Sequence, residues 1–313
     1  MAARAVDSKP SHRLVHHGRA RTGDMRNEPV FNTAEVLELL RLTEVEQDKY
    51  RGGTIRIGTP RVFGGQMLGQ ALRAASATVK HKLVASLHAV FVSPGDLDKA
   101  IDYQVERVRE GRAFSSRRVV ASQDGQHIFN MTMLFHGEEE GVSRFMPPPL
   151  VEPPDGMEPN SPHWRHRPDE TASISFPAPV DFRCAPSEAF GMPCARQPSQ
   201  QIWARAPLSL GNDPVDHQSL FAYISDYGLL WTAIKAEGVG PYDPRMQASS
   251  LSHTIWFHRT FRMDDWLLLS MSSPSTAGGR GLNLSHVYDG RGEMVASVAQ
   301  EGLFRFPAGV PAR

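Results

Sequence analysis

The stretch SLHAVF at residues 86–91 returns in longer form at residues 250–257 as SLSHTIWF, and this repetition decides the fold. After each copy come, in the same order, a Gly-Arg pair, an Asp-Gly turn and a strand-like run that ends in Phe. The matched residues are separated by 165 to 169 positions: His88 and His253, Gly111 and Gly279, Asp124 and Asp289, Phe135 and Phe304. A repeat of that length indicates a duplicated domain rather than a solenoid of short repeats.

The composition of the 313-residue chain is typical of a globular protein with two domains of ordinary size. Lys+Arg and Asp+Glu are both 34, so no excess charge indicates a nucleic-acid or membrane partner. No apolar run is long enough for a membrane span. The two cysteines, Cys184 and Cys194, have no CxxC or HxxxH pattern beside them, which favours a reducing compartment over a disulfide framework or a metal site. We therefore expect a cytoplasmic protein without a metal or a cofactor.

The duplicated units are predicted to be joined by a long connection. We expect a first unit at residues 31–136, a Pro-rich connection at 137–207, a second unit at 208–307 and a tail at 308–313. Residues 1–30 are Arg-rich and have almost no apolar periodicity, which predicts a disordered basic extension. A transit peptide is the alternative, because such segments are Arg-rich and acid-poor, but the amphipathic stripe that they carry is missing.

Each unit is predicted to consist of one buried helix and an antiparallel sheet. After Phe63, small and apolar residues recur at helical spacing, and in the second unit we expect the equivalent helix at residues 224–236. Four strand-like runs follow each helix, separated by turn signals: residues 84–92, 101–109, 114–123 and 128–135, then 251–258, 266–272, 281–288 and 294–304. A sheet of this width can wrap around its helix, so the predicted fold class is α+β.

Polar residues present in only one copy are the natural candidates for a functional site, because both copies share a scaffold. Gln300 lies on a strand face that is otherwise apolar or small, where an amide without partners costs roughly 1–3 kcal/mol. Matched by spacing, three polar residues of the second copy replace small or apolar residues of the first: Asp226 replaces Gly64, Ser250 replaces Ala85 and Gln300 replaces Met131. A structural alternative exists for each, since an acid at a helix start is commonly a cap and a buried amide commonly bonds a strand carbonyl.

The runs RVFGGQMLGQAL, SLHAVFVSPGD, HTIWFHR and ASVAQEGLFR occur in this order between residues 33 and 306. Together they resemble the acyl-CoA thioesterase II family, which is built as a double hotdog, two antiparallel sheets each wrapped around a central helix. The resemblance implies that Asp226, at the start of the second hotdog helix, holds a water molecule together with Ser250 and Gln300. Some relatives have Thr at the position of Ser250, which keeps the hydroxyl, and some have Asp at the position of Ser252.

The same resemblance implies an enzyme that hydrolyses fatty acyl-CoA to free fatty acid and CoA. A thioester carbonyl is electrophilic and a thiolate leaves well, so a positioned water suffices without a covalent intermediate. We predict Asp226 as the general base, Ser250 and Gln300 as residues that orient the water, and helix N–H groups as the oxyanion site. The alternatives are an acyl-CoA-binding protein of low activity and a hotdog enoyl-thioester hydratase, which would need a His paired with Asp226. The chain contains no GxSxG, HExxH or P-loop motif.

For the acyl-CoA substrate we expect contacts with the Gly64-Gly65 turn, where no side chain blocks approach, and with a pocket wall made of Met67, Leu68 and Ala71. Ala71→Phe should then shift the preference toward shorter acyl chains. Residues 84–92 are apolar on both faces of the predicted strand. We therefore expect the two copies to pack sheet against sheet and the double unit to form a homo-oligomer, a dimer or a tetramer.

Overall fold

The computed structural model describes residues 32–157, 179–184, 198–235 and 246–305. The chain divides into residues 1–30 and a unit of residues 31–313, and every described residue belongs to the second unit. The predicted extension, the predicted tail and Cys194 lie outside the described residues. Within the described ranges, no helix is both long enough and apolar enough to cross a membrane.

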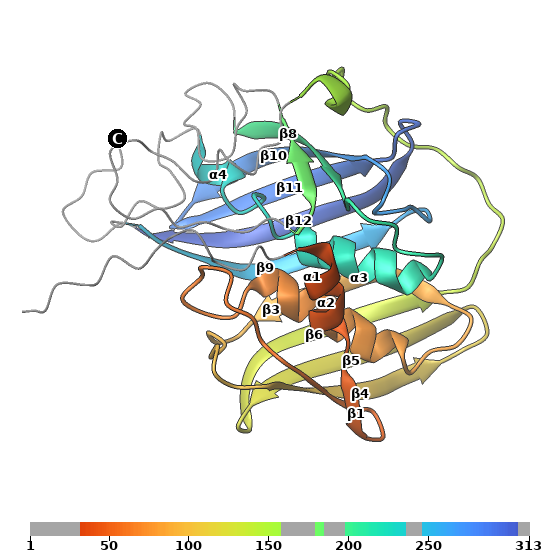
Figure 1. Cartoon of the computed structure of the whole chain (residues 1–313), viewed down its shortest axis with the longest axis vertical. Coiled ribbons are helices and arrows are strands. Elements are labelled where there is room, and N and C mark those ends of the chain that lie inside the picture. The colour runs from red at the N-terminus through yellow and green to blue at the C-terminus, as the bar shows by residue number, and fades with distance from the viewer. Residues whose placement is uncertain (1–31, 158–178, 185–197, 236–245, 306–313) are drawn as a thin grey trace, which may run out of the picture. The chain divides into compact units, whose positions relative to one another are not determined.

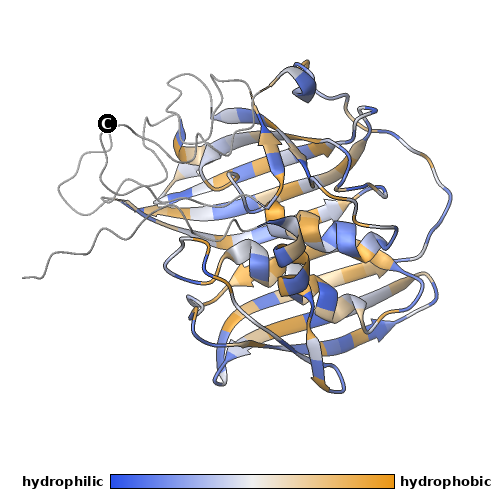
Figure 2. Cartoon of the chain, in the orientation of Figure 1, coloured by the Kyte–Doolittle hydropathy of each residue, from blue (hydrophilic) through white to orange (hydrophobic). Residues whose placement is uncertain are grey.

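One antiparallel sheet of twelve strands runs through the described residues, in the order β1-β2-β4-β5-β6-β3-β9-β12-β11-β10-β8-β7 (Figure 1). The second six strands repeat the order of the first six in reverse, as expected for two copies related by a twofold axis. Apolar and polar residues alternate along many of the strands (Figure 2). The strands of the first half are β1 (Thr43–Glu46), β2 (Lys49–Gly52), β3 (Leu83–Phe91), β4 (Ile101–Glu110), β5 (Phe114–Gln123) and β6 (Gln126–His136). Those of the second half are β7 (Asp181–Arg183), β8 (Ser199–Arg205), β9 (Gln247–Phe257), β10 (Leu267–Ala277), β11 (Arg280–Tyr288) and β12 (Met294–Arg305).

The two halves are joined through neighbouring edges of their sheets. β3 pairs antiparallel with β9, so that His88 lies opposite Thr254 near the pseudo-twofold axis. The expectation that the copies pack sheet against sheet is therefore wrong. An unpaired edge strand exposes a row of backbone N–H and C=O groups, and the β3–β9 pairing satisfies two such edges at once.

Helices α2 (Gly64–Ser76) and α3 (Pro214–Ile224) pack against each other at the centre of the molecule, and α1 (Thr33–Leu40) contacts both (Figure 1). α2 begins directly after Phe63, as its small and apolar residues predict, and it packs on β3, β4, β5 and β6. The two backbones approach closely at Gly65, where an added Cβ would lie 2.1 Å from the carbonyl oxygen of Tyr223. Only glycine permits this approach, which brings the first turn of α2 to the end of α3.

The prediction of one helix at residues 224–236 is wrong. α3 ends at Ile224, residues 225–231 form turns, and a short helix, α4 (Thr232–Lys235), follows. The start of α3 is set by Asp213, whose side chain accepts a hydrogen bond from the N–H of Val215, and by a proline in the first turn. α3 is buried on nearly all sides from His217 onward, so its sequence lacks the one-sided apolar stripe by which surface helices are found.

Two strands lie inside the segment predicted to be only a connection, residues 137–207. β8 pairs with β10, and β7 pairs with β8, so both strands extend the second half of the sheet. They occupy the places that β2 and β1 occupy in the first half. The second half of the sheet therefore begins before residue 208.

Matching bulges in β3 and β9 determine which residues of the two halves correspond. The extra residue is Ala85 in β3 and Leu251 in β9, which sets the offset between the two strands at 166 residues. Ser250 therefore corresponds to Val84 and not to Ala85. A shift by one residue in a strand moves a side chain to the opposite face, so spacing alone could not find this match.

The same bulges correct the counterpart of Gln300. Gln300 lies opposite His253 on β9, and His253 corresponds to Leu87, which lies opposite Met133. The counterpart of Gln300 is therefore Met133 and not Met131. Both corrected counterparts, Val84 and Met133, are buried and apolar, so the replacement of polar by apolar residues remains.

Candidate active site

Asp226 lies in the turn that follows α3 and faces the first turn of α2. Its Oδ2 accepts a hydrogen bond of 3.0 Å from the backbone N–H of Gly65. A Cβ on Gly64 would lie 2.6 Å from the same oxygen, so glycine leaves the room that the carboxylate needs. The N-cap residue of α2, Phe63, makes no side-chain cap, and the positive end of this helix is therefore open toward Asp226.

The sequence predicts that Asp226 begins the second helix and corresponds to Gly64. Both predictions are wrong. Asp226 follows the end of α3 and contacts Gly64 across the interface between the halves. The acid of the second half thus meets the helix N-terminus of the first half. The candidate site is shared between the two copies.

Ser250 and Gln300 both contact the carboxylate of Asp226. The Ser250 hydroxyl, beside the bulge in β9, donates to Oδ1 over 3.3 Å. The Nε2 of Gln300, on β12, donates to the same oxygen and also to the Oγ of Ser250 over 3.0 Å. The structure therefore brings together the three residues that the sequence selected.

The environment of Asp226 matches what a general base needs near neutral pH. Burial raises the pKa of Asp226 to about 7, against hydrogen bonds from Gln300, Ser250 and the Gly65 N–H that favour the ionised form. A base with a pKa near the working pH combines a useful ionised fraction with a real affinity for the proton. The described titratable neighbours, His253 and Tyr223, stay neutral because burial lowers the pKa of His253 to about 3 and raises that of Tyr223.

A cavity of about 670 Å³ opens beside Asp226. Asp226 and Ser250 lie on its wall, while the fully buried Gln300 lies behind them. The wall is largely apolar, which suits an acyl chain. The described residues that line the cavity are 58–64, Met67, 91–95, Asp226, Leu230, Trp231, 246–251 and Leu303.

The residues predicted to contact the substrate divide into two groups. Gly64 and Met67 line the cavity, and Gly65 bonds to Asp226. Leu68 and Ala71 are fully buried and are not part of the cavity wall. Ala71→Phe would therefore crowd the core between the helices instead of shortening the acyl pocket.

Two residues near the site were not selected from the sequence. Arg61 is the only cation among the described residues that line the cavity, and its guanidinium donates to the carbonyl of Ala248 over 3.4 Å. His253 is fully buried, with Nδ1 at 4.0 Å from Oδ1 of Asp226. When the two copies are matched by identical residues, His253 pairs with His88 and does not stand out as a difference between them. When they are matched at the bulges, His253 pairs with Leu87, an apolar residue.

Two family models match the chain, one for each half of the sheet. "Acyl-CoA thioesterase N-terminal domain" matches residues 53–136, and "Acyl-CoA thioesterase" matches residues 183–303. Acyl-coenzyme A thioesterase 8 of Mus musculus is 32% identical over 308 residues, covering 92% of this chain and 94% of that protein. Acyl-CoA thioesterase 2 of Haemophilus influenzae is 31% identical over 290 residues, covering 87% of this chain and 97% of that protein.

Among solved structures, the acyl-CoA thioesterase II of Mycobacterium marinum has a TM-score of 0.72 at 35% identity, covering 88% of this chain and 100% of that one. The fold and the similarity to these proteins together define a thioester hydrolase of the hotdog class. The predicted double hotdog is confirmed, and its two sheets are joined into one continuous sheet. The chain belongs to the acyl-CoA thioesterase family.

Proposed function

We propose that this acyl-CoA thioesterase hydrolyses its substrate by the attack of a water molecule that Asp226 deprotonates. The observation that carries the proposal is the convergence of Ser250, Gln300 and the Gly65 N–H on one buried carboxylate at the cavity wall. Asp226 takes a proton from water as the water oxygen attacks the thioester carbonyl. It returns the proton to the thiolate of CoA as the C–S bond breaks, so the acid is regenerated as a carboxylate.

The tetrahedral intermediate carries a negative charge on the former carbonyl oxygen. Gly64, in the first turn of α2, is part of the cavity wall, so the positive end of the helix dipole faces the cavity. The Gly65 N–H donates to Asp226 and the Gln66 N–H to the carbonyl of Phe63, so the Gly64 N–H is the proposed donor to the oxyanion. Preorganised donors of this kind stabilise a developing oxyanion without rearrangement. Ser250, on the cavity wall, holds the attacking water with Asp226, and Gln300 holds both of these side chains in place.

A hydratase would need an acid and a histidine that both reach the substrate. His253 lies near Asp226, but its Nδ1 is 4.0 Å away and the ring is fully buried behind the cavity wall. This placement supports hydrolysis over hydration. A binding protein of low activity would have no use for a buried carboxylate poised to take a proton.

The test is to incubate the purified chain with palmitoyl-CoA and follow free thiol with a thiol-reactive dye. Release of one thiol and one palmitate for each substrate consumed supports the proposal. Binding without thiol release identifies an acyl-CoA-binding protein. Loss of the enoyl chromophore from an enoyl-CoA, again without thiol release, identifies a hydratase.

The proposed assembly is a symmetric homo-oligomer, and the outer face of the sheet is its contact surface. Val90, Leu134 and Trp256 on the central strands β3, β6 and β9 are 53%, 38% and 40% exposed. Large exposed apolar side chains grouped on one face favour association. Light scattering distinguishes a monomer from a dimer or a tetramer. The cytoplasmic location stays a prediction, which cell fractionation tests.

A further inference from the structure

Three polar side chains form a row across the inner face of the second half of the sheet. His253 on β9 lies opposite Gln300 on β12, and Gln300 lies opposite Asn283 on β11. All three residues are fully buried. Opposed residues on neighbouring strands have their Cβ atoms roughly 4.5–5.5 Å apart, so Gln300 is a direct neighbour of both His253 and Asn283, which lie on either side of it.

Each member of the row has a polar atom without a hydrogen-bond partner among the described residues. These atoms are Nδ1 of His253, Oε1 of Gln300 and both amide atoms of Asn283. The hydroxyl of Ser225 donates to the carbonyl of Ala222 over 2.9 Å, so its oxygen accepts from Nε2 of His253, also at 2.9 Å. This assignment leaves Nδ1 of His253 as an acceptor. The row therefore presents three acceptors, Nδ1 of His253, Oε1 of Gln300 and Oδ1 of Asn283, and one amide donor, Nδ2 of Asn283.

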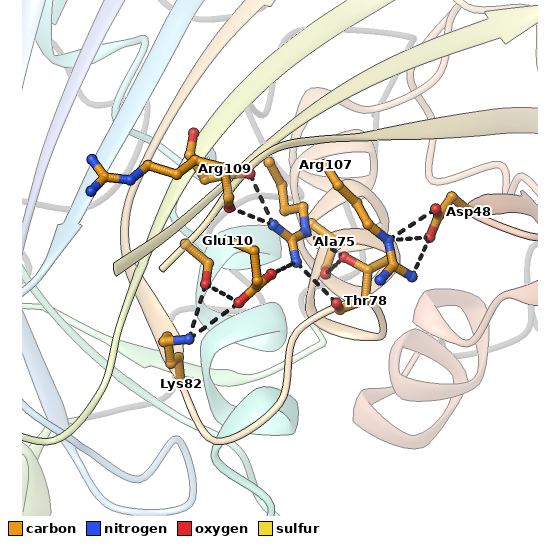
Figure 3. A network of polar contacts seen from close by, with 10 residues as sticks. Asp48, Ala75, Thr78, Lys82, Arg107, Arg109 and Glu110 are labelled. Atoms are coloured by element: carbon orange, nitrogen blue, oxygen red, sulfur yellow. Dashed lines mark hydrogen bonds and ion pairs between the residues drawn. The ribbon is translucent and has the colours of Figure 1, made fainter. Parts of the chain in front are cut away.

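The corresponding row of the first half has no such atoms. It consists of Leu87, Met133 and Arg117. The buried Arg117 guanidinium donates to the Oγ1 and the carbonyl of Thr78, to two further carbonyls and to the carboxylate of Glu110. Figure 3 shows Thr78, Glu110 and Lys82 of this network. The fold can thus supply hydrogen-bond partners for the polar group of Arg117, at the position that corresponds to Asn283. The scaffold therefore does not by itself explain why the Asn283 amide has no partner among the described residues.

We infer that His253, Gln300 and Asn283 bind one ordered water molecule that fixes the orientation of the Gln300 amide. The water donates its two hydrogens to Nδ1 of His253 and Oε1 of Gln300 and accepts one from Nδ2 of Asn283. Three hydrogen bonds are typical of a buried water. Held through Oε1, the amide keeps Nε2 directed at Asp226 and Ser250, as observed. Asn283 and His253 are thus positioning residues, and this role rests on the proposed function.

The inference is tested first with Asn283→Val, using palmitoyl-CoA and thiol release. Removing the donor lets the Gln300 amide turn, so kcat should fall about tenfold with little change in KM, because misplaced catalytic groups lower turnover. The melting temperature should change little, since the apolar side chain removes a buried polar group together with its hydrogen bond to the water. Asn283→Ser, which keeps a polar group, should retain most of the turnover.

Ser285→Ala is the matched control. Ser285 lies two residues further along β11 on the same face and is 2% exposed. Its side-chain oxygen also has no partner in the part of the chain that the structure describes, but Ser285 lies opposite Val298. Its removal should leave kcat unchanged. An equal loss of kcat in Ser285→Ala and Asn283→Val would overturn the inference, because the effect would then come from the core and not from Gln300.

A second test asks whether Asn283 acts through Gln300. In a Gln300→Met background, Asn283→Val should cause no further loss of kcat, whereas a purely structural effect would add. In the wild-type background, loss of the Gln300 hydrogen bond raises the pKa of Asp226, so the acid limb of the kcat/KM profile should move to higher pH. Full additivity, or an unmoved acid limb, would overturn the inference.

The outcomes separate this inference from the proposed function. A wild-type chain that releases no thiol overturns both. A wild-type chain that is active, together with a Gln300→Met variant of lowered kcat and a fully active Asn283→Val, overturns the water site alone. A crystal structure in which no water contacts the three side chains overturns it directly.

Discussion

The two halves share one scaffold and differ where chemistry is expected. At equivalent places of the sheet, the second half has Ser250, His253, Gln300 and Asn283, and the first half has Val84, Leu87, Met133 and Arg117. In the second set, Ser250, His253 and Gln300 lie at a buried carboxylate, while the first set is apolar or fully satisfied. Both halves thus have the same fold, whereas only the second half has the polar residues of the candidate site.

The N-termini of α2 and α3 also differ, and here the first half has the feature that the second half lacks. α3 is capped by Asp213, which accepts from the N–H of Val215, whereas Phe63 gives α2 no side-chain cap. The open N-terminus belongs to the half without the acid, and Gly65 turns it toward Asp226. Each half therefore supplies what the other lacks, and neither half alone contains the site.

The strongest test of this asymmetry is Asp226→Asn. Loss of the general base should lower kcat by about 100-fold or more, because proton transfer by a positioned side chain typically contributes that much. The amide is close in size to the carboxylate, so the fold should be retained. Thiol release measures kcat, and circular dichroism is the control for folding. A well-folded variant with turnover near the wild type would rule out Asp226 as the base.

Gln300→Met copies the residue of the first half into the second. We expect kcat to fall by roughly 10- to 100-fold, because the carboxylate and Ser250 lose the donor that holds them in position at the cavity wall. Stability should be equal or higher, since Met133 shows that the scaffold accepts this side chain. The reverse exchange, Met133→Gln, should cost about 1–3 kcal/mol of folding free energy without creating activity. Retained activity with a lower melting temperature would make Gln300 a structural amide.

The pH dependence should show the raised pKa of Asp226. The base must be ionised, so kcat/KM should rise with pH through about 7 and level off above it. Because the folded-state pKa exceeds the unfolded value, the folded protein binds the extra proton between about pH 4 and pH 7, and this contribution to stability is lost as pH rises. Asp226→Asn should therefore raise the melting temperature relative to wild type more at pH 8 than at pH 5. An acid limb near pH 4 would contradict the raised pKa.

Much of the fold follows from local pattern. α2 and the eight strands β3–β6 and β9–β12 were found because small-residue spacing, alternation and turn signals such as Asp124-Gly125 act over a few residues. The edge pairing of β3 with β9 was missed because backbone pairing across a pseudo-twofold axis leaves no mark in side-chain order. α3 was misplaced because burial on all sides removes the apolar stripe on which prediction depends.

The site was predictable where a residue type conflicts with its surroundings. Gln300 on an apolar strand face is such a conflict, whereas Asp226 and Ser250 were selected by comparing the two copies and by the family resemblance. His253 and Asn283 were missed because their counterparts become visible only after the bulges at Ala85 and Leu251 set the register. A bulge shifts every later residue by one, and one residue reverses the face of a strand.

The smallest expected effect concerns Arg61, which lies at the cavity in the first half and has no acidic partner within the described residues. The half-buried Arg61 guanidinium is suited to a phosphate of CoA, so Arg61→Gln should raise KM for palmitoyl-CoA by roughly fivefold, with kcat unchanged, as expected for one ionic contact at the cavity wall. Palmitoyl-pantetheine, which lacks the nucleotide phosphates, should show no change in KM with the same variant. Arg56→Gln is the matched control, because Arg56 lies on the same loop but pairs with Asp98 at 2.6 Å and is not part of the cavity wall. Equal KM changes for both substrates would show that Arg61 shapes the loop and does not bind CoA, which would leave substrate recognition to the half that carries Asp226.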